Sequence, residues 1–296
     1  MGNCSSTEVG ATLIWSPDGK QSILSEQTLF LGSTTFMVDG RILLLNPGDN
    51  DEPLPLQLSD TVGSLEKRID IGLGIAPFWI TNDLFGFIQP ASGADRLSDQ
   101  ALVLMSPDEL QAEVTATTAD LREQIPEDNL RNGLFMRYAI AHPTNPDLLL
   151  VMASFQTRNR LSNGFLFQLN RQTGAIELLF ELDLVVGLHT LGFSPDGHFL
   201  ITTDSWLQES IYDDNIFPFG RLYVYDFETA EHQTILTNNN AFFPAFIFDW
   251  SADGNWLAIN RGRNMIDLIA PAYNYQQTVI HQAGDCALLA WVNPIP

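Results

Sequence analysis

The chain has 296 residues and is strongly acidic, with 36 Asp and Glu residues against 14 Lys and Arg residues and a formal net charge of −22. This charge favours solubility, and it argues against general binding to nucleic-acid phosphates or to anionic lipid surfaces. Hydrophobic residues make up 45% of the chain and charged residues only 17%, so we expect a folded protein with a large core rather than a disordered one.

The first ten residues are interpreted as a separate segment, either disordered or anchoring. Met1–Ser6, with the sequence MGNCSS, fits the N-myristoylation pattern, with Gly2 as the acceptor and Cys4 as a neighbouring palmitoylation candidate. Alternatively, Cys4 begins a bacterial lipoprotein whose leader is missing, or the segment is a frayed polar end. The sequence shows no signal peptide and no apolar run of transmembrane length. The expected location is therefore cytoplasmic by default, or the membrane or envelope if the N-terminus is lipidated or a leader is missing.

A hairpin signal recurs along the rest of the chain. In Leu191–Thr203, two β-prone runs flank the sequence SPDG at Ser194–Gly197, whose Pro, Asp and Gly residues all favour a tight turn. Related hairpins can be aligned on the residue that ends their first strand. These residues are Trp15, Trp79, Ala141, Phe193 and Trp250, with Trp291 beginning an incomplete further unit.

Two more strand-like runs follow each hairpin, with turn residues between them. They cover residues 41–46 and 53–58, 101–106 and 112–117, 164–170 and 175–182, 221–227 and 232–237, and 265–270 and 276–281. The polar stretch 118–129 is the one helix-like segment, and Pro126 interrupts it. Repeated four-stranded units, which bury their faces only by stacking on one another, are typical of β-propellers.

The sequence therefore predicts an all-β fold, a β-propeller of four-stranded antiparallel blades in a single domain over residues 11–296. Five blades are complete, and Cys286–Val292 supplies part of a sixth; the alternative is a six-bladed propeller. The turns at Trp15–Gly19 and Phe193–Gly197, with a near copy at Trp250–Gly254, resemble the WD-like repeats of TolB-type β-propellers. The resemblance implies an architecture whose members act as scaffolds for other proteins or accompany enzymes.

Arginine residues gather in connections that a propeller would place on its top face, opposite the turns inside the opening hairpins. Arginine binds carboxylates through two parallel hydrogen bonds, so such a cluster suits an acidic partner surface. The alternative is pairing with neighbouring acidic residues of the same chain. The candidates are Arg158, Arg160, Arg261 and Arg263.

A second candidate is the aromatic-rich stretch Ser205–Gly220, interpreted as a long top-face loop. Exposed aromatic residues on a loop are typical interface anchors, although they can equally pack onto the propeller itself. The candidate interaction residues in this stretch are Trp206, Tyr212, Phe217 and Phe219.

The sequence predicts no catalytic residue, metal or cofactor. It has no Gly-x-Ser-x-Gly elbow, its five histidines lack metal-ligand spacing, and Cys4 and Cys286 are too few for a structural zinc site. We therefore expect a non-enzymatic scaffold that binds another protein, and not nucleic acid, through its top-face loops. The alternatives are a glycan- or peptide-directed hydrolase or ligand binder that uses the mouth of the central channel, and a propeller whose companion domain is encoded separately.

Overall fold

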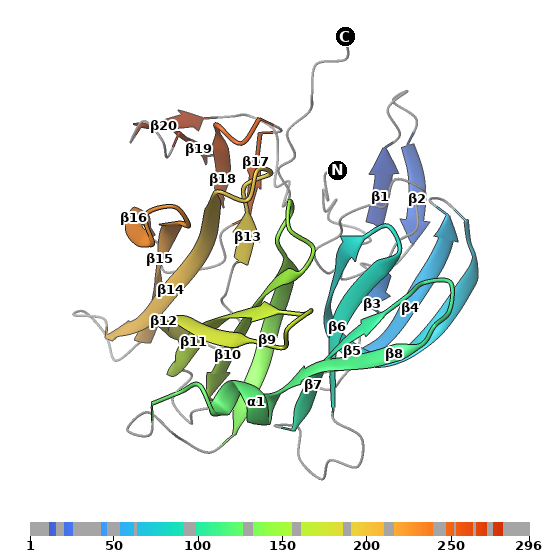
Figure 1. Ribbon diagram of the computed structural model, residues 1–296. Coiled ribbons are helices and arrows are strands. Elements are labelled where there is room, and N and C mark those ends of the chain that lie inside the picture. The colour runs from blue at the N-terminus through green and yellow to red at the C-terminus, as the bar shows by residue number, and fades with distance from the viewer. Residues whose placement is uncertain are drawn as a thin grey trace. The chain divides into compact units, whose positions relative to one another are not determined.

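The computed structural model describes residues 12–15, 21–25, 43–45, 54–61, 64–90, 99–126, 133–155, 161–185, 191–209, 216–238, 247–251, 253–262, 265–270 and 275–280. The chain forms two compact units, one of residues 29–183 and one of residues 1–28 with 184–296. Strands dominate both units (Figure 1). In the described part of the chain, no helix is long and apolar enough to cross a membrane. The prediction of one domain over residues 11–296 stays a prediction.

The unit of residues 29–183 holds a six-stranded and a four-stranded antiparallel sheet, each with its strands in sequence order. The six-stranded sheet consists of β3 (Leu43–Leu45), β4 (Leu54–Thr61), β5 (Ser64–Thr81), β6 (Leu84–Pro90), β7 (Gln100–Met105) and β8 (Ala112–Thr117). The four-stranded sheet consists of β9 (Leu134–Ala141), β10 (Leu148–Phe155), β11 (Leu161–Asn170) and β12 (Ile176–Val185).

Strand β5 has 18 residues and joins two sheets into one. Its first part, up to Gly74, pairs with β4, and its second part, from Ile75, pairs with β6. Between these parts the backbone bends, with φ values of 129° at Gly72 and 48° at Ala76 and a shift in register after Ile75. The second part of β5 with β6, β7 and β8 is the predicted four-stranded unit. The first part, which carries Lys67 and Arg68, lies in none of the strand-like runs predicted from the sequence.

Both faces of β6 and β7 are buried, because neighbouring sheets pack on each side. On one face, Phe85 and Phe87 of β6 join Leu56 and Leu58 of β4 in an apolar cluster. On the other face, residues such as Ile88 join the apolar residues of the β9–β12 sheet in a second cluster. The even alternation of a strand thus sends successive side chains into different cores. Continuous apolar strands follow from this double burial.

The core between the β5–β8 and β9–β12 strands is rich in aromatic residues. Phe155 and Phe165 are fully buried there and meet edge to face, with ring centroids 5.5 Å apart. The short helix α1 (Thr118–Arg122) contributes Leu121 to the same cluster, and a capping box between Thr117 and Asp120 starts the helix. The helix spans the first five residues of the stretch 118–129, which is helix-like in sequence, and it lies in the connection between β8 and β9.

The unit of residues 1–28 with 184–296 is also built of antiparallel sheets. It holds a two-stranded sheet, β1 (Thr12–Trp15) and β2 (Gln21–Ser25). Two four-stranded sheets follow, consisting of β13 (Leu191–Phe193), β14 (Phe199–Glu209), β15 (Ile216–Asp226) and β16 (Glu231–Asn238), and of β17 (Ile247–Trp250), β18 (Leu257–Gly262), β19 (Met265–Ala270) and β20 (Tyr275–Ile280).

These two four-stranded sheets share one apolar core. Ile201, Leu222 and Val224 of the first pack with residues of the second that include Trp250. Phe199 stacks on the Trp250 ring, with centroids 6.2 Å apart and planes inclined by 10°. The predicted strand quartets are confirmed for the units that begin at Trp79, Ala141, Phe193 and Trp250. The partial sixth blade at Cys286–Val292 lies outside the described residues, and the blade count stays a prediction.

The turn that joins the third and fourth strands has the same form in three sheets. In the β9–β12 sheet, the Asn170 side chain accepts the backbone N–H groups of Gln172 and Thr173, and Gly174 closes the turn at φ +70° by donating to the Asn170 carbonyl over 2.8 Å. In the β13–β16 sheet, Ala230 occupies the corresponding position at φ +55°. Leu110 does so in the β5–β8 strands at φ +52°. An L-residue in this left-handed conformation is strained.

We therefore expect Ala230→Gly to raise the free energy of unfolding by about 0.5–1 kcal/mol, because glycine adopts this conformation without the Cβ penalty. Gly174→Ala should lower it by a similar amount. No heavy atom lies within 4 Å of the Cβ that this change would add, so its effect comes from the backbone alone. Urea unfolding of the two variants measures both changes, and a loss of stability in Ala230→Gly would contradict the account of the turn.

Candidate functional site

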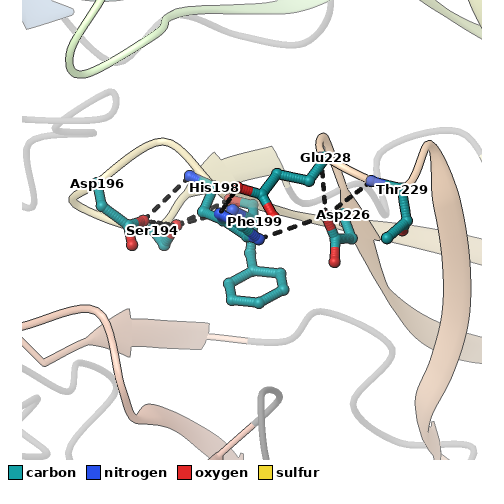
Figure 2. A network of polar contacts seen from close by, with 7 residues as sticks. All are labelled: Ser194, Asp196, His198, Phe199, Asp226, Glu228 and Thr229. Atoms are coloured by element: carbon teal, nitrogen blue, oxygen red, sulfur yellow. Dashed lines mark hydrogen bonds and ion pairs between the residues drawn. The ribbon is translucent and has the colours of Figure 1, made fainter.

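The most connected polar network in the described residues is the turn of the β13–β14 hairpin (Figure 2). Ser194 is fully buried, and its hydroxyl donates to Asp196 Oδ1 over 2.5 Å while accepting the Phe199 N–H over 2.9 Å. Asp196 Oδ1 also accepts the His198 N–H over 3.0 Å, and the Gly197 N–H donates to the Ser194 carbonyl over 2.9 Å. The Ser, Asp and Gly of the SPDG motif thus hold the turn itself.

The β17–β18 hairpin repeats this network with different residues. The Ser251 hydroxyl donates to Asp253 Oδ1 over 2.6 Å and accepts the Trp256 N–H over 2.9 Å. The Asn255 N–H donates to Asp253 Oδ1 over 3.1 Å, and the Gly254 N–H donates to the Ser251 carbonyl over 2.9 Å. The same chemistry at two sites shows that the motif is a structural device of the hairpin.

His198 links the hairpin turn to the second turn of its own sheet. Its Nε2 lies 3.4 Å from Asp226 Oδ1, and its Nδ1 lies 3.8 Å from Glu228 Oε1. The His198 carbonyl accepts the Phe227 N–H over 3.1 Å. Asp226 Oδ1 also accepts the backbone N–H groups of Glu228 and Thr229, so this carboxylate is bound into its own turn, as Figure 2 shows.

The β9–β12 sheet makes the same link with the charges reversed. Asp147 lies in the hairpin turn, and its Oδ1 is 2.9 Å from Nε of Arg171 in the second turn. The Gln172 amide donates to Asp147 Oδ2 over 2.6 Å. The Arg171 N–H donates to the Asp147 carbonyl over 2.9 Å, which matches the backbone bond between Phe227 and His198. Both sheets therefore tie their two turns together by one backbone bond and two polar side-chain contacts.

The hairpin turns of the β13–β16 and β17–β20 sheets also touch each other. A Cβ placed on Gly254 would lie 3.5 Å from Oδ2 of Asp196. Asp196, Glu228 and Asp253 are all exposed near this junction, so the turns form an acidic surface. Within the described residues, no group of His, Cys, Asp and Glu side chains is arranged to hold a metal ion.

The hydrogen bonds of the two hairpin turns lower the pKa values of Asp196 and Asp253. Partial burial raises the pKa of Asp196. Hydrogen bonds from the Ser194 hydroxyl and the His198 N–H, together with the His198 charge, lower this pKa by more. The pKa of Asp196 therefore lies below its ordinary value of 3.8. Hydrogen bonds from Ser251 and Asn255 lower the pKa of Asp253. Both carboxylates are held as acceptors for the turn.

The predicted interaction residues fall into two groups. Trp206, Phe217, Phe219 and Arg261 lie in strands β14, β15 and β18, so their assignment to loops is wrong. The others lie outside the described residues, and their roles in interaction or lipidation stay predictions. These are Arg158, Arg160, Tyr212, Arg263, Gly2 and Cys4.

The stretch interpreted as an aromatic loop is largely the distal half of the β14–β15 hairpin. Strand pairing continues from Phe199 opposite Asp226 to Glu209 opposite Ile216. Among the described residues, β13 pairs with β14 from Phe193 to Leu191, and β16 pairs with β15 from Glu231 to Asn238; residues 186–190 and 239–246 lie outside the described residues. Residues 205–209 and 216–219 form the distal half of the hairpin, which reaches beyond the drawn strand β13 in Figure 1. We call it the distal ribbon.

Sequence reasoning missed one polar arrangement, around Arg137 on the innermost strand β9. The register of β9 and β10 shifts at this point, with Met136 opposite Ala153 and Tyr138 opposite Met152, which leaves Arg137 in a bulge. Its Nε donates to the buried Ser154 hydroxyl over 2.8 Å, and its Cζ lies 5.0 Å from the centre of a Phe ring on the same strand. A single charged residue within the apolar run 134–141 was the signal that could have identified it.

The described sheets are similar to those of solved β-propellers. The β-propeller domain of Cps50 (Swd1) from Myceliophteria thermophila aligns with a TM-score of 0.51 at 10% identity, over 92% of this chain and 81% of that one. The chain is a β-propeller. With its stacked four-stranded sheets, this confirms the predicted fold class and, at the level of the fold, the resemblance to known β-propellers.

Two further structures align with lower scores. TolB from Acinetobacter baumannii gives a TM-score of 0.49 at 16% identity over 83% of this chain, which spans only 54% of the length of that structure. Oligogalacturonate lyase from Vibrio parahaemolyticus gives 0.43 at 10% identity, over 92% of this chain and 85% of that one. No protein-family model and no curated protein sequence matches the chain. The likeness to the Cps50 domain shows the fold and leaves the activity open.

The hydrogen bond from Ser194 makes the titration of Asp196 testable. Because the pKa of Asp196 in the folded protein lies below the ordinary value of 3.8, its charge stabilises the fold above that value, and this contribution is lost as the pH falls through the lower pKa. Ser194→Ala should move the pKa of Asp196 upwards.

Carboxyl-carbon NMR titration of the two proteins measures this change directly. Asp253 serves as an internal control, because its own partner, Ser251, is unchanged in the variant. An Asp196 titration that is the same in both proteins would show that Ser194 does not hold the carboxylate.

Proposed function

We propose that the protein is a non-catalytic β-propeller scaffold that binds another protein, with the distal ribbon as part of the binding surface. The observation that carries the proposal is that β14 and β15 stay paired as far as Glu209 opposite Ile216, in a stretch rich in aromatic residues. Apolar residues gain stability from a surface that covers them. This ribbon consists mainly of apolar residues at the positions of Trp206, Leu207, Ile216, Phe217 and Phe219.

The large aromatic residues support an interface rather than a simple connection. Trp206 stands opposite Phe219 in the register, and Phe217 stands opposite Gln208. Trp and other large aromatic residues supply a large share of binding energy in protein interfaces, because they bury a large area with few rotatable bonds. A short connection between two strands would require none of them.

The turn networks support a non-catalytic role for the residues that most resemble catalytic ones. The Ser194 hydroxyl donates to Asp196 and not to a histidine, and His198 faces two carboxylates of the second turn. A serine nucleophile requires a general base that accepts its proton. The described Ser, Asp and His side chains of this network therefore fit a structural role better than an enzymatic one.

Co-purification with matched variants tests the proposal. We expect Trp206→Ala combined with Phe219→Ala to reduce recovery of a bound partner from source cells by about tenfold or more, since loss of two anchors costs at least the 1.4 kcal/mol that corresponds to a factor of ten. Trp256→Ala is the control, because this tryptophan is exposed and lies in the turn of the β17–β18 hairpin. Equal recovery with all three proteins would exclude the distal ribbon as the interface.

A further inference from the structure

The β9–β12 sheet carries a charged residue, Arg137, on the face opposite the apolar core that it shares with the β5–β8 strands. Phe135 of β9 and Ser154 of β10 are cross-strand partners and share this face. Their neighbours Met136 and Ala153 lie in the apolar core on the other face. The Arg137 side chain contacts both Phe135 and Ser154, so it lies on the same face as they do.

Two contacts fix the orientation of the Arg137 guanidinium. Its Nε donates to the Ser154 hydroxyl over 2.8 Å, and its Cζ lies 5.0 Å from the centre of the Phe135 ring. The bulge between β9 and β10 brings the side chain to this position. Arg137 is partly buried, so its charge acts on a nearby anion more strongly than a fully exposed charge would.

The buried Ser154 hydroxyl is a donor that lacks an acceptor within the described residues. A serine hydroxyl both donates and accepts, and here its oxygen accepts the Arg137 N–H. Ser154 is 2% exposed, and this is its one hydrogen bond in the part of the chain that the structure describes. A buried donor without an acceptor is unfavourable, so we expect an acceptor beside Ser154 that is not one of these residues.

We propose that Arg137 and Ser154 bind the carboxylate of a small monoanionic ligand. The guanidinium and the hydroxyl proton are neighbouring donors, and a carboxylate has two oxygens that can accept a hydrogen bond from each. Arg137 makes at least one further contact, which is compatible with binding because a guanidinium has several N–H donors. The site uses strands other than those of the distal ribbon, so this inference is independent of the proposed function.

The charge of the protein favours a monocarboxylate over other oxyanions. The chain has a net charge of −22, and the repulsion of an anion grows with the charge that the anion carries. A phosphate dianion is therefore repelled more strongly than a carboxylate of single charge. A carboxylate also matches the planar guanidinium, which binds such groups through parallel hydrogen bonds.

NMR titration of the full chain with sodium acetate tests the proposal, with the signal of the Arg137 Nε–H group as the readout. Absence of this signal in Arg137→Lys identifies it. We expect a saturable shift with acetate that sodium chloride of the same ionic strength does not produce, and weaker binding of phosphate. Arg171 is the internal control, because its Nε already donates to Asp147 Oδ1 over 2.9 Å and its signal should not shift.

Variants then separate the two donors. Ser154→Ala should weaken acetate binding about tenfold, because it removes the hydroxyl proton and leaves the guanidinium in place. Arg171→Lys is the matched control and should leave the response of the Arg137 signal unchanged. Urea unfolding verifies that Ser154→Ala is folded, and the wild-type titration needs no variant. The absence of a saturable acetate shift would overturn the proposal and would leave water as the acceptor for Ser154. Equal affinity for acetate and phosphate, or equal acetate affinity of the wild type and a folded Ser154→Ala variant, would also overturn it.

Discussion

The structure depends on burial of sheets on both faces. A four-stranded sheet with two apolar faces is not stable alone, and in each unit of this chain a neighbouring sheet covers it. The burial explains why the sequences of β6 and β7 are almost continuously apolar rather than alternating. Some of the polar groups in these cores join neighbouring strands of different sheets. Gln100, for example, accepts the Met136 N–H over 2.6 Å and so ties β7 to β9 across the interface.

The turns of the opening hairpins provide hydrogen-bond partners for backbone N–H groups at the ends of the strands. Ser194 and Ser251 are buried and use their hydroxyls to accept the N–H groups of Phe199 and Trp256, at the start of the next strand and just before it. The aspartates of the same turns accept hydrogen bonds from these hydroxyl groups. The side chains of these turns therefore serve the fold.

The recurring turns were predictable from the sequence because their chemistry is local. Ser, Pro, Asp and Gly at Ser194–Gly197 each favour the turn by themselves, and aligning the hairpins on their aromatic residues predicted the strand quartets. The first part of β5 was not predictable in this way, because Lys67, Arg68 and Gly72 interrupt its apolar pattern. Its strand character depends on pairing with β4, which is a tertiary effect.

The candidate site was predicted in composition but not in conformation. The aromatic residues of 205–220 pointed to an interaction surface, but Pro218 and the acidic residues made the stretch look like a loop. In the structure, pairing across the hairpin overrides these local signals up to Glu209 and Ile216. The bulge at Arg137 carries no local turn signal at all, since it results from the register that β9 adopts against β10.

Stability measurements on neighbouring residues of β7 test the double burial of the sheets most directly. Leu102 and Val103 are adjacent, point to opposite faces and are both fully buried, whereas Val114 is the cross-strand partner of Val103 and is 57% exposed. In urea unfolding, Leu102→Ala and Val103→Ala should each lower the free energy of unfolding by about 2 kcal/mol or more, and Val114→Ala by less than about 0.5 kcal/mol. A negligible effect of either Leu102→Ala or Val103→Ala would mean that one face of the sheet is open to water, and would contradict the stacking of sheets on which this account rests.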